Sequence, residues 1–409
     1  MKKKIKTNPK ILMVGTGSLL NYGCEAIVQG TYALTRKYWP ESELFVASDD
    51  IAYDTKLFAG CEKISFVPYR KRFTPYRLLM GILRRIGIGA GSPVRMDCSV
   101  IDNYDIFLSV GGDIFSESPN GYLYHHLLDL MEIGDRAKKL GKMYALWGAS
   151  VGPFQDKNLS IVKKNLLKAV AIFAREEITF DYLNSIGLAA EKSHLVADPA
   201  FWMAPEYTPL PIKKKPDELL IGLNISPLSV GVSFDNYDEG KKYIFESLDA
   251  LLEKNPYYRF LCIPHVMSDS GSSQDDFSFM RSYRDFSRYK NQVDVIDFGL
   301  GARKTKSIVS QCDLLVAARM HCCVAGLSSS TPTLLLTYSH KGTGMSQYVY
   351  GNTDLALSVK EITQQSLCNK FEFIENKLKN YREHLTAQQG RFKNDAAEAI
   401  ITLKNIYTE

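Results

Sequence analysis

Short apolar runs alternate with stretches of helical periodicity along most of the chain. Runs such as Leu219–Asn224 and Leu314–Ala317 predict buried strands, and segments such as Tyr237–Lys254 and Cys322–Ser329 predict helices. In most of the chain, a predicted helix separates one predicted strand from the next. This alternation is typical of α/β proteins, and it predicts parallel, doubly wound sheets.

The pattern is interrupted between residues 204 and 217. This segment contains four prolines and three consecutive lysines and has no apolar periodicity. A chain of 409 residues is also long for a single hydrophobic core. We therefore predict a Rossmann-like domain over residues 1–203, a linker over 204–217 and a second Rossmann-like domain over 218–370. The charged helical pattern over 371–409 predicts a C-terminal helix that crosses back to the first domain.

Composition and charge exclude several classes of protein. The net charge of +5 is mild for this length and does not indicate a nucleic-acid binder. The eight cysteines form no Cys-x-x-Cys pair, so we expect reduced thiols rather than a disulfide framework or a metal site. No apolar stretch approaches the length of a transmembrane helix. We therefore expect a cytoplasmic protein that needs no metal.

A basic segment over residues 68–89 leaves two interpretations open. It contains no acidic residue, and its apolar positions follow helical spacing. This pattern predicts either a helix that contacts the inner face of a membrane or a core-facing helix whose cations face water. The six cations are Arg70, Lys71, Arg72, Arg77, Arg84 and Arg85.

A glycine-containing loop follows the first predicted strand. Gly15 and Gly17 imitate a dinucleotide-binding fingerprint, but Leu20 stands where the third glycine is needed. We therefore do not expect a nicotinamide or flavin cofactor. A turn of this kind can still present backbone N–H groups to an anion.

Polar side chains follow several predicted strands. Open α/β sheets bind ligands at the carboxyl ends of their strands, which makes these side chains candidates for a site. Arg319 and His321 follow Leu314–Ala317 and would place an anion-binding group beside a proton donor. The alternative is a surface ion pair for Arg319 and a helix cap for His321. Further residues of this kind are Gly112, Asp113, Arg175, His265 and His340.

Each of these further residues also has a structural interpretation. Asp113 could cap a helix, and Arg175 could pair with the two glutamates that follow it. A single histidine such as His265 or His340 often serves as a satisfied structural side chain.

The order and spacing of seven motifs resemble the polysaccharide pyruvyl transferase family. The resemblance extends from Gly15 to Gly351 and departs from the family modestly at Cys24, where an acidic or small residue is more usual. It implies two Rossmann-like domains facing across a cleft, as in GT-B glycosyltransferases. The motifs are Asn21–Ile27, Ser109–Asp113, Gly148–Phe154, Ala174–Glu176, Ala197–Phe201, Ile263–His265 and Ala318–His321.

The resemblance also implies an activity and a set of site residues. The activity is transfer of a pyruvyl group from phosphoenolpyruvate to a sugar as a ketal, with release of phosphate. Arg175 and Arg319 would hold the donor, and His321 would be the general acid. Gly152 and His340 would complete the donor side. The acceptor side, in the N-terminal domain for the most part, would involve Asn21, Gly23, Glu25, Gly112, Asp113 and His265.

The residues fit this chemistry. Planar guanidinium groups bind carboxylate and phosphate through two hydrogen bonds at once, and a histidine can donate a proton near neutral pH. The expected partners are phosphoenolpyruvate as co-substrate and a carbohydrate acceptor, most simply a lipid-linked oligosaccharide. The alternatives are a GT-B glycosyltransferase that uses a nucleotide sugar and a non-catalytic sugar-binding protein.

Overall fold

The computed structural model describes residues 7–69, 98–110, 115–118, 120–188, 191–267 and 274–409. Within these residues the chain divides into two compact units. The first unit contains residues up to 19, 31–199 and 394–409, and the second contains 20–30 and 200–393. Gly112, Asp113 and almost all of the basic segment over 68–89 lie outside the described residues.

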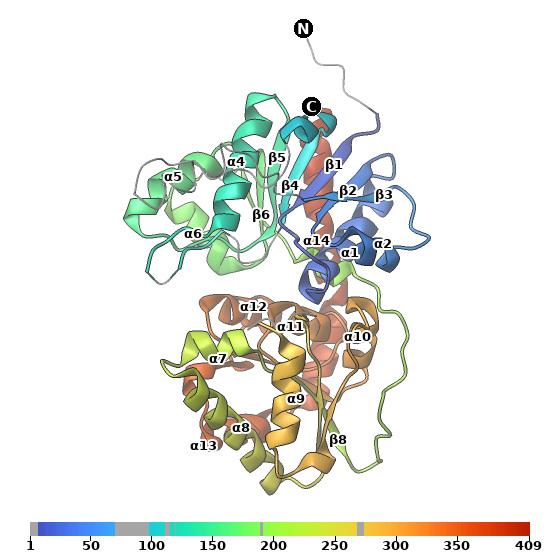
Figure 1. Ribbon diagram of the computed structural model, residues 1–409, viewed down its shortest axis with the longest axis vertical. Helices are drawn as coiled ribbons and strands as arrows, with labels where there is room; N and C mark the ends of the chain where they lie inside the picture. Colours follow the sequence, from blue (N-terminus) through green and yellow to red (C-terminus); the bar gives the residue numbers. More distant parts are fainter. Residues whose placement is uncertain (1–6, 70–97, 111–114, 119, 189–190, 268–273) are drawn as a thin grey trace. The chain divides into compact units, whose positions relative to one another are not determined.

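A seven-stranded sheet forms the first unit, with strand order β3-β2-β1-β4-β5-β6-β7 (Figure 1). Every neighbouring pair in it is parallel. The strand order reverses between β1 and β4, which makes this a doubly wound sheet. The strands are β1 (Lys10–Val14), β2 (Glu43–Ser48), β3 (Ile64–Pro68), β4 (Ile106–Val110), β5 (Met143–Ala149), β6 (Ala171–Ala174) and β7 (Ser193–Leu195).

The helices of the first unit cover this sheet and enclose an apolar core. All residues of β4 and β6 are buried, as continuous apolar strands of a parallel sheet should be. Tyr144, Phe107 and Phe115 are among the large side chains of the core. The helices are the second half of α1 (Tyr22–Tyr38), α2 (Ile51–Leu57), α4 (His125–Lys139), α5 (Asp156–Leu166), α6 (Glu177–Ser185) and the end of α14 (Leu378–Thr408), with a short 3-10 segment at Cys98–Asn103. A second 3-10 segment, Pro199–Trp202, includes the point in the sequence where the first unit gives way to the second.

A six-stranded parallel sheet forms the second unit, with strand order β10-β9-β8-β11-β12-β13. The order reverses between β8 and β11, so the carboxyl ends of these two strands form the point where doubly wound sheets bind ligands. The strands are β8 (Leu219–Asn224), β9 (Tyr258–Cys262), β10 (Val293–Val295), β11 (Leu314–Ala317), β12 (Thr333–Thr337) and β13 (Ala356–Ser358).

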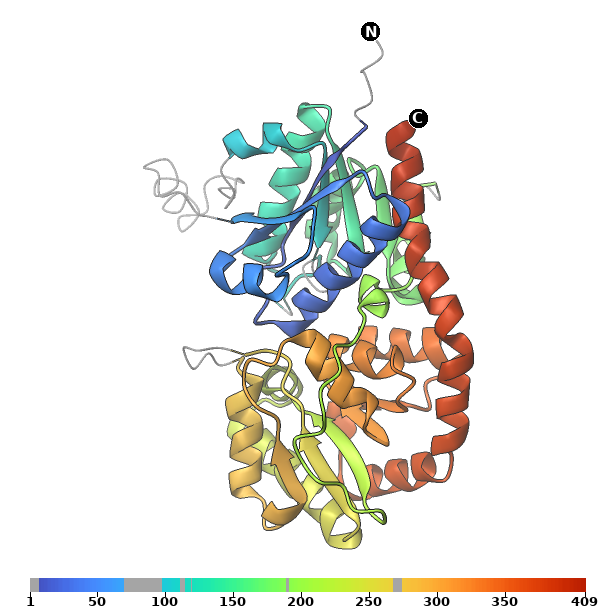
Figure 2. The same ribbon diagram turned by 90° about the vertical axis from the view of Figure 1, so that its right-hand side faces the viewer.

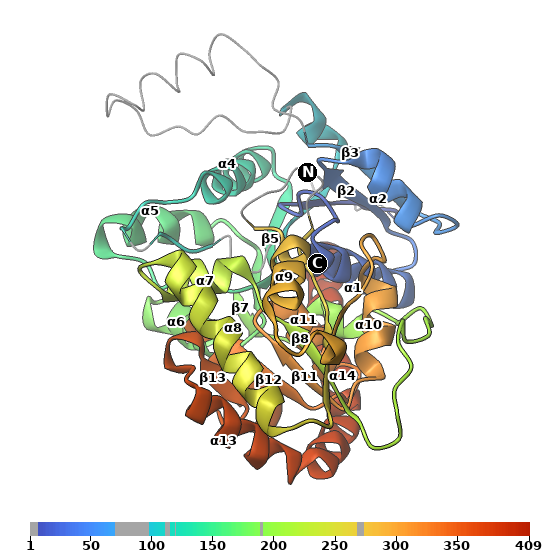
Figure 3. The same ribbon diagram turned by 60° about the horizontal axis from the view of Figure 1, so that its bottom comes forward.

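Helices lie on both faces of the second sheet. Figure 2 shows the gold helix α9 on one side of the strands and the orange helices on the other, and Figure 3 shows α8 and α9 in front of β8, β11 and β12. The helices are α7 (Pro227–Ser233), α8 (Tyr237–Lys254), α9 (Asp276–Phe286), α10 (Ala302–Ser310), α11 (Met320–Leu327), α12 (His340–Tyr350) and α13 (Gln364–Glu375), with 3-10 segments at Lys290–Gln292 and Val359–Glu361.

The structure confirms the predicted α/β class with two Rossmann-like, doubly wound sheets. Strands β8 and β11 have the predicted bounds, whereas helix α11 begins at Met320, two residues earlier than predicted. Helix α12 was not predicted, because Gly342 and Gly344 weaken its helical pattern. Among the described residues, no helix is both long enough and apolar enough to cross a membrane.

Candidate active site

Asn224 joins the carboxyl ends of three strands in the second unit. It is the last residue of β8 and is fully buried. Its side-chain Nδ2 donates to the carbonyl of Ile263, after β9, at 2.8 Å. Its Oδ1 accepts from the backbone N–H of Arg319, after β11, at 2.9 Å. One amide side chain therefore fixes the backbone from which Arg319 and its neighbours project.

The guanidinium group of Arg319 is held by a buried carboxylate. Its Nε and Nη2 donate to Oδ1 of Asp276 at 3.1 and 2.8 Å, and Nη2 also donates to the carbonyl of Gln274 at 3.1 Å. The side chain of Arg319 is 12% exposed and that of Asp276 is fully buried. Asp276 also accepts from the backbone N–H groups of His265 and Val266.

Asp276 is charged in this arrangement, although burial raises its pKa. Among the described residues, its carboxylate oxygens accept hydrogen bonds from Arg319 and from backbone N–H groups, and these donors oppose the effect of burial on the pKa. A protonated carboxyl would have to turn its own O–H toward one of these donors. We therefore assign a carboxylate to Asp276 and a buried ion pair to the two side chains.

His321 lies in the first turn of α11, one residue after its first residue, Met320. Arg319 is the N-cap of the same helix, so the two candidate side chains share one helix start. The imidazole of His321 is partly exposed and lies against the start of α1. A Cβ atom at Gly23 would lie 2.5 Å from Nδ1 of His321, so the ring occupies space that only a glycine leaves open.

His265, in the loop after β9, also contacts the start of α1. The backbone N–H of Tyr22 donates to the carbonyl of His265 at 2.9 Å, and the two rings meet edge to face with centroids 5.9 Å apart. Burial lowers the pKa of His265 to about 3, and the electrostatic effects of the neighbouring His321 and Arg319 act in the same direction. Its buried Nδ1 has no hydrogen-bond partner among the described residues. His265 is therefore a neutral imidazole at neutral pH.

A family model described as polysaccharide pyruvyl transferase matches residues 21–340. The chain belongs to this family. Membership makes it a transferase of polysaccharide biosynthesis with a carbohydrate acceptor. The matched region includes every residue that builds the site described above.

Solved structures of other enzymes share the fold of this pyruvyl transferase. UDP-GlcNAc 2-epimerase from Neisseria meningitidis, bound to UDP-GlcNAc, has a TM-score of 0.60 at 12% identity, over 97% of this chain and 100% of that chain. The Anabaena protein HepE, in complex with UDP and glucose, has a TM-score of 0.58 at 11% identity, over 98% of this chain and 99% of that chain. A glycosyltransferase from Rickettsia africae has a TM-score of 0.58 at 11% identity, over 98% of each chain. The fold of this pyruvyl transferase is therefore GT-B-like.

Two predicted acceptor-binding residues of the pyruvyl transferase have structural partners. Oδ1 of Asn21 accepts from the backbone N–H of Gly23 at 3.0 Å and so caps α1. Oε2 of Glu25 accepts from the backbone N–H of Ala302 at 2.6 Å, at the start of α10. Helix α10 has a glycine as its N-cap residue, so the buried Glu25 supplies the cap. These contacts give both residues a structural role, and the acceptor-binding role predicted for them stays a prediction.

Arg175, in the first unit, also has structural partners. Its Nη1 donates to Oδ2 of Asp198 at 3.0 Å, and its Nε donates to Oγ of Ser150 at 3.0 Å. Both charged side chains of this ion pair are buried. The sequence offered Glu176 as a partner, but that carboxylate accepts from Thr179 and caps α6. The donor-binding role of Arg175 stays a prediction.

Gly152 and His340 complete the predicted donor side. A Cβ atom at Gly152 would overlap the ring of Tyr182, and the φ of Gly152 is +72°, so packing and backbone both favour glycine there. His340 is the first residue of α12, and its side chain is outside the description. The roles predicted for these two residues remain untested.

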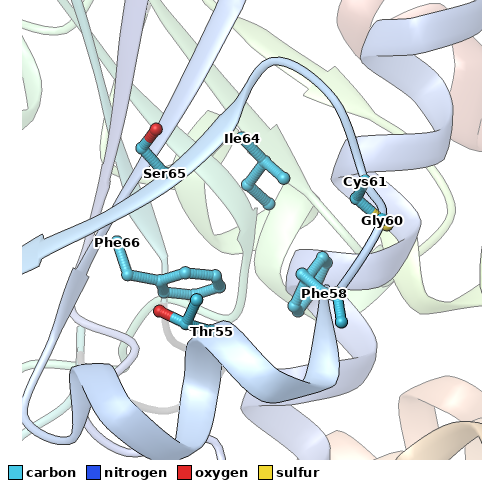
Figure 4. A pocket seen from close by; sticks show the side chains of 8 residues that line it. Thr55, Phe58, Gly60, Cys61, Ile64, Ser65 and Phe66 are labelled. Carbon is cyan, nitrogen blue, oxygen red and sulfur yellow. The ribbon is translucent and has the colours of Figure 1, made fainter.

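A cavity of about 430 Å³ lies elsewhere in the first unit, between α2 and β3 (Figure 4). Phe58, Ile64 and Phe66 form apolar walls, and Thr55 and Ser65 contribute hydroxyl groups. The cavity includes the amino-terminal residues of β3, whereas ligands of doubly wound sheets bind at the carboxyl ends. None of its lining residues is charged, so we do not include it in the candidate active site.

Sequence reasoning missed Asn224 and Asp276. Asn224 ends a strand whose bounds were predicted correctly, so the strand-end rule that selected Arg319 could have selected it too. Asp276 gave no such signal, because it opens a helix and follows Asp275, the helix N-cap. Among the described residues, no group of three or more His, Cys, Asp or Glu side chains could hold a metal ion.

Proposed function

We propose that this pyruvyl transferase takes its pyruvyl group from phosphoenolpyruvate and attaches it to two hydroxyls of a sugar as a ketal. The observation that supports this proposal is the pairing of Arg319 with His321 at one helix start, where β8 and β11 end. An anionic donor requires a fixed cation, and its methylene carbon requires a proton. These two residues provide both functions within one turn of chain.

Arg319 and the amino end of α11 favour an anion at this place. The guanidinium is oriented by Asp276, and the helix contributes the positive end of its dipole. The carboxylate or phosphate of the donor would bind there. Arg175 is our proposed second donor-binding residue on the ground of family resemblance, and Gly152 and His340 belong to the same proposal.

His321 is the proposed proton donor. It would protonate C3 of phosphoenolpyruvate, converting the methylene to a methyl group and making C2 electrophilic. One sugar hydroxyl then adds to C2, and the second hydroxyl adds as the C2–O bond to phosphate breaks. One hydroxyl proton restores His321 and the other leaves with phosphate, so the products are the ketal and inorganic phosphate. Positioned acid catalysis typically contributes about 10²–10⁴ in rate.

His265 cannot replace His321 as the acid. Its pKa of about 3 leaves the ring uncharged at neutral pH. A neutral imidazole can instead accept a hydrogen bond, which suits a residue that orients an acceptor hydroxyl. We therefore propose that His265 serves the acceptor side, together with Asn21, Gly23, Glu25, Gly112 and Asp113 as the resemblance implies.

Phosphate release provides the test. The protein is incubated with phosphoenolpyruvate and either free or lipid-linked oligosaccharide, and released phosphate is measured. We expect release that depends on both substrates, and a new ketal methyl signal in the NMR spectrum of the product. Release from phosphoenolpyruvate without a ketal would contradict the proposal. Preference for the lipid-linked acceptor would support work at the inner face of a membrane.

A GT-B glycosyltransferase remains the second candidate. It rests on the likeness to the Anabaena and Rickettsia proteins, which are 11% identical to this chain and therefore inform the fold. The same acceptors, offered UDP-sugars in place of phosphoenolpyruvate, distinguish the two functions. Release of UDP with glycosylated product would favour the glycosyltransferase.

A further inference from the structure

We propose that Asp276 is a positioning residue that sets the orientation of the Arg319 guanidinium for donor binding. This inference rests on the proposed function, in which Arg319 binds the anionic donor. Asp276 does not contact the donor itself in this proposal. It acts through Arg319, and its loss should therefore impair donor binding although it removes a negative charge.

The contacts between the two side chains fix the orientation of the Arg319 guanidinium plane as well as its position. Nε of Arg319 lies 3.1 and 3.2 Å from the two oxygens of Asp276, and Nη2 lies 2.8 Å from Oδ1. The carbonyl of Gln274 accepts from Nη2 on the same edge of the guanidinium. Because the guanidinium is planar, holding two of its nitrogens determines the direction of the whole group.

The backbone after β9 holds the Asp276 carboxylate in place. Its Oδ2 accepts from the backbone N–H groups of His265 and Val266 at 3.2 and 3.1 Å. The side chain is fully buried and belongs to the first residue of α9. A ligand carboxylate could therefore not displace it without breaking the loop after β9. The carboxylate is a fixed support and not a temporary occupant of a donor site.

Capping of α9 does not explain Asp276. The neighbouring Asp275 performs that role, since its carboxylate accepts from the backbone N–H groups of Phe277 and Ser278. Two adjacent acidic residues thus have separate tasks, one for the helix and one for Arg319. This division provides a matched control, because Asn is nearly as good an N-cap as Asp.

The orientation of Arg319 matters because His321 lies two residues further on the same backbone. A donor held by Arg319 presents its methylene carbon to His321 at a distance set by the guanidinium plane. A misplacement of about 1 Å can reduce catalysis by about 10²-fold. Asp276 thereby links donor binding to proton transfer without contacting the reacting atoms.

Replacing Asp276 with Asn tests this role, because charge and orientation predict opposite results. Loss of a carboxylate makes the site more positive and would tighten binding of phosphoenolpyruvate if charge alone mattered. We expect instead that Asp276→Asn weakens binding by about tenfold to a hundredfold in calorimetry, while Asp275→Asn stays near wild type. Tighter or unchanged donor binding in a folded Asp276→Asn protein would overturn the proposal.

A double-mutant cycle shows whether Asp276 acts through Arg319. In an Arg319→Lys background, Asp276→Asn should change donor affinity little further, because the oriented fork is already lost. Additive losses in the two variants would show an independent role and contradict the proposal. Asp276→Glu keeps the negative charge but places it on a side chain one methylene longer. If thermal denaturation shows that Asp276→Asn does not fold, Asp276→Glu is used in its place in both measurements.

A readout without donor separates this inference from the proposed function. The Nε–H of Arg319 can be followed by NMR after arginine labelling and assigned by its disappearance in Arg319→Lys. We expect slow hydrogen exchange of this group in the wild type and fast exchange in Asp276→Asn. Slow exchange with no affinity for phosphoenolpyruvate would reject the proposed function and keep the positioning. Equal exchange in both proteins would reject the positioning.

Discussion

Gly23 and His321 approach each other so closely that a side chain at position 23 has no room. A Cβ atom there would lie 2.5 Å from Nδ1 and 2.9 Å from Cγ of the imidazole. We predict that Gly23→Ala lowers turnover strongly, because the added methyl displaces the His321 ring. Gly23 is the second residue of α1, where alanine is compatible with the helix, so the substitution itself should not cost helix stability. Lower activity without lower melting temperature is therefore the expected result.

Gly390 provides the control for this substitution. It lies inside α14, and a Cβ atom there would have nothing within 4 Å. Gly390→Ala should leave turnover unchanged. Equal activity of the two alanine variants would show that the position of His321 is not set by Gly23.

His321→Gln should retain donor affinity and lose about 10²–10⁴ in turnover, the range for loss of a general acid. The reason is that Arg319 remains to hold the donor while the proton source is gone. Calorimetry with phosphoenolpyruvate and phosphate release measure the two quantities. His194→Gln on β7, in the first unit, is the control and should change neither. Near-normal turnover in His321→Gln would remove this residue from the mechanism.

Arg319→Lys should weaken donor binding although the charge is kept. Lysine cannot reproduce the two-nitrogen contact with Asp276, so its ammonium would not be oriented in the same way. Isothermal calorimetry with phosphoenolpyruvate measures the change. Wild-type affinity in this variant would show that Arg319 is structural.

Arg175 and Asp198 allow the structural and functional roles of a buried ion pair to be separated. Asp198→Asn should destabilise the protein by about 3–5 kcal/mol, because it removes the carboxylate from a buried ion pair. Urea denaturation measures this loss. If Arg175→Lys weakens donor binding while unfolding at the wild-type urea concentration, Arg175 is a donor ligand as the family resemblance implies.

Lys306 should make stability depend on pH in the alkaline range. Burial, and then repulsion from Lys393, lowers its pKa from 10.5 to about 7 in the folded protein. Between these values the unfolded chain binds a proton that the folded protein does not. Stability is therefore lost as the pH falls from 10.5 to about 7 and is constant below that range as far as this group is concerned.

Lys306→Met should remove this dependence. The substitution loses the hydrogen bond from Nζ to the carbonyl of Met203, but it also removes the buried ionisable group. We expect a higher melting temperature than wild type at pH 7 and a smaller gain near pH 10. Lys304→Met, on the exposed side of the same helix, should show no such trend. A gain that is the same at both pH values would contradict the assignment.

The fold was more predictable from sequence than the contacts of the site. Strands β8 and β11 are buried over nearly their whole length, so short apolar runs marked their bounds correctly. The start of α11 was placed two residues too late, because its N-cap, Arg319, makes no side-chain capping hydrogen bond and the polar His321 interrupts the apolar pattern of the first turn. Strand and helix patterns arise from neighbouring residues, and these are visible in one sequence.

The site contacts depend on pairs of residues that are distant along the chain. Asp276 and Arg319 are 43 residues apart, and nothing in the sequence around either one indicates the other. The strand-end rule selected Arg319 and His321 but could not indicate that Gly23 limits the space of His321. The same rule selected Arg175, but it could not indicate that the Arg175 guanidinium forms a buried ion pair with Asp198. Position in the sheet was predictable, and the partner of each side chain was not.

The assignment of residues 20–30 to the second unit limits how the chain can be divided. A fragment that begins at the proline-rich segment after residue 203 would lack the Tyr22 backbone that bonds to His265 and the Glu25 carboxylate that caps α10. The parts of the chain before and after this segment therefore cannot be exchanged independently between relatives. Recombination between relatives at that segment would combine His321, the proposed proton donor, from one parent with the Gly23 that leaves room for its ring from another. Chimeras should therefore lose activity unless residues 20–30 are exchanged as well.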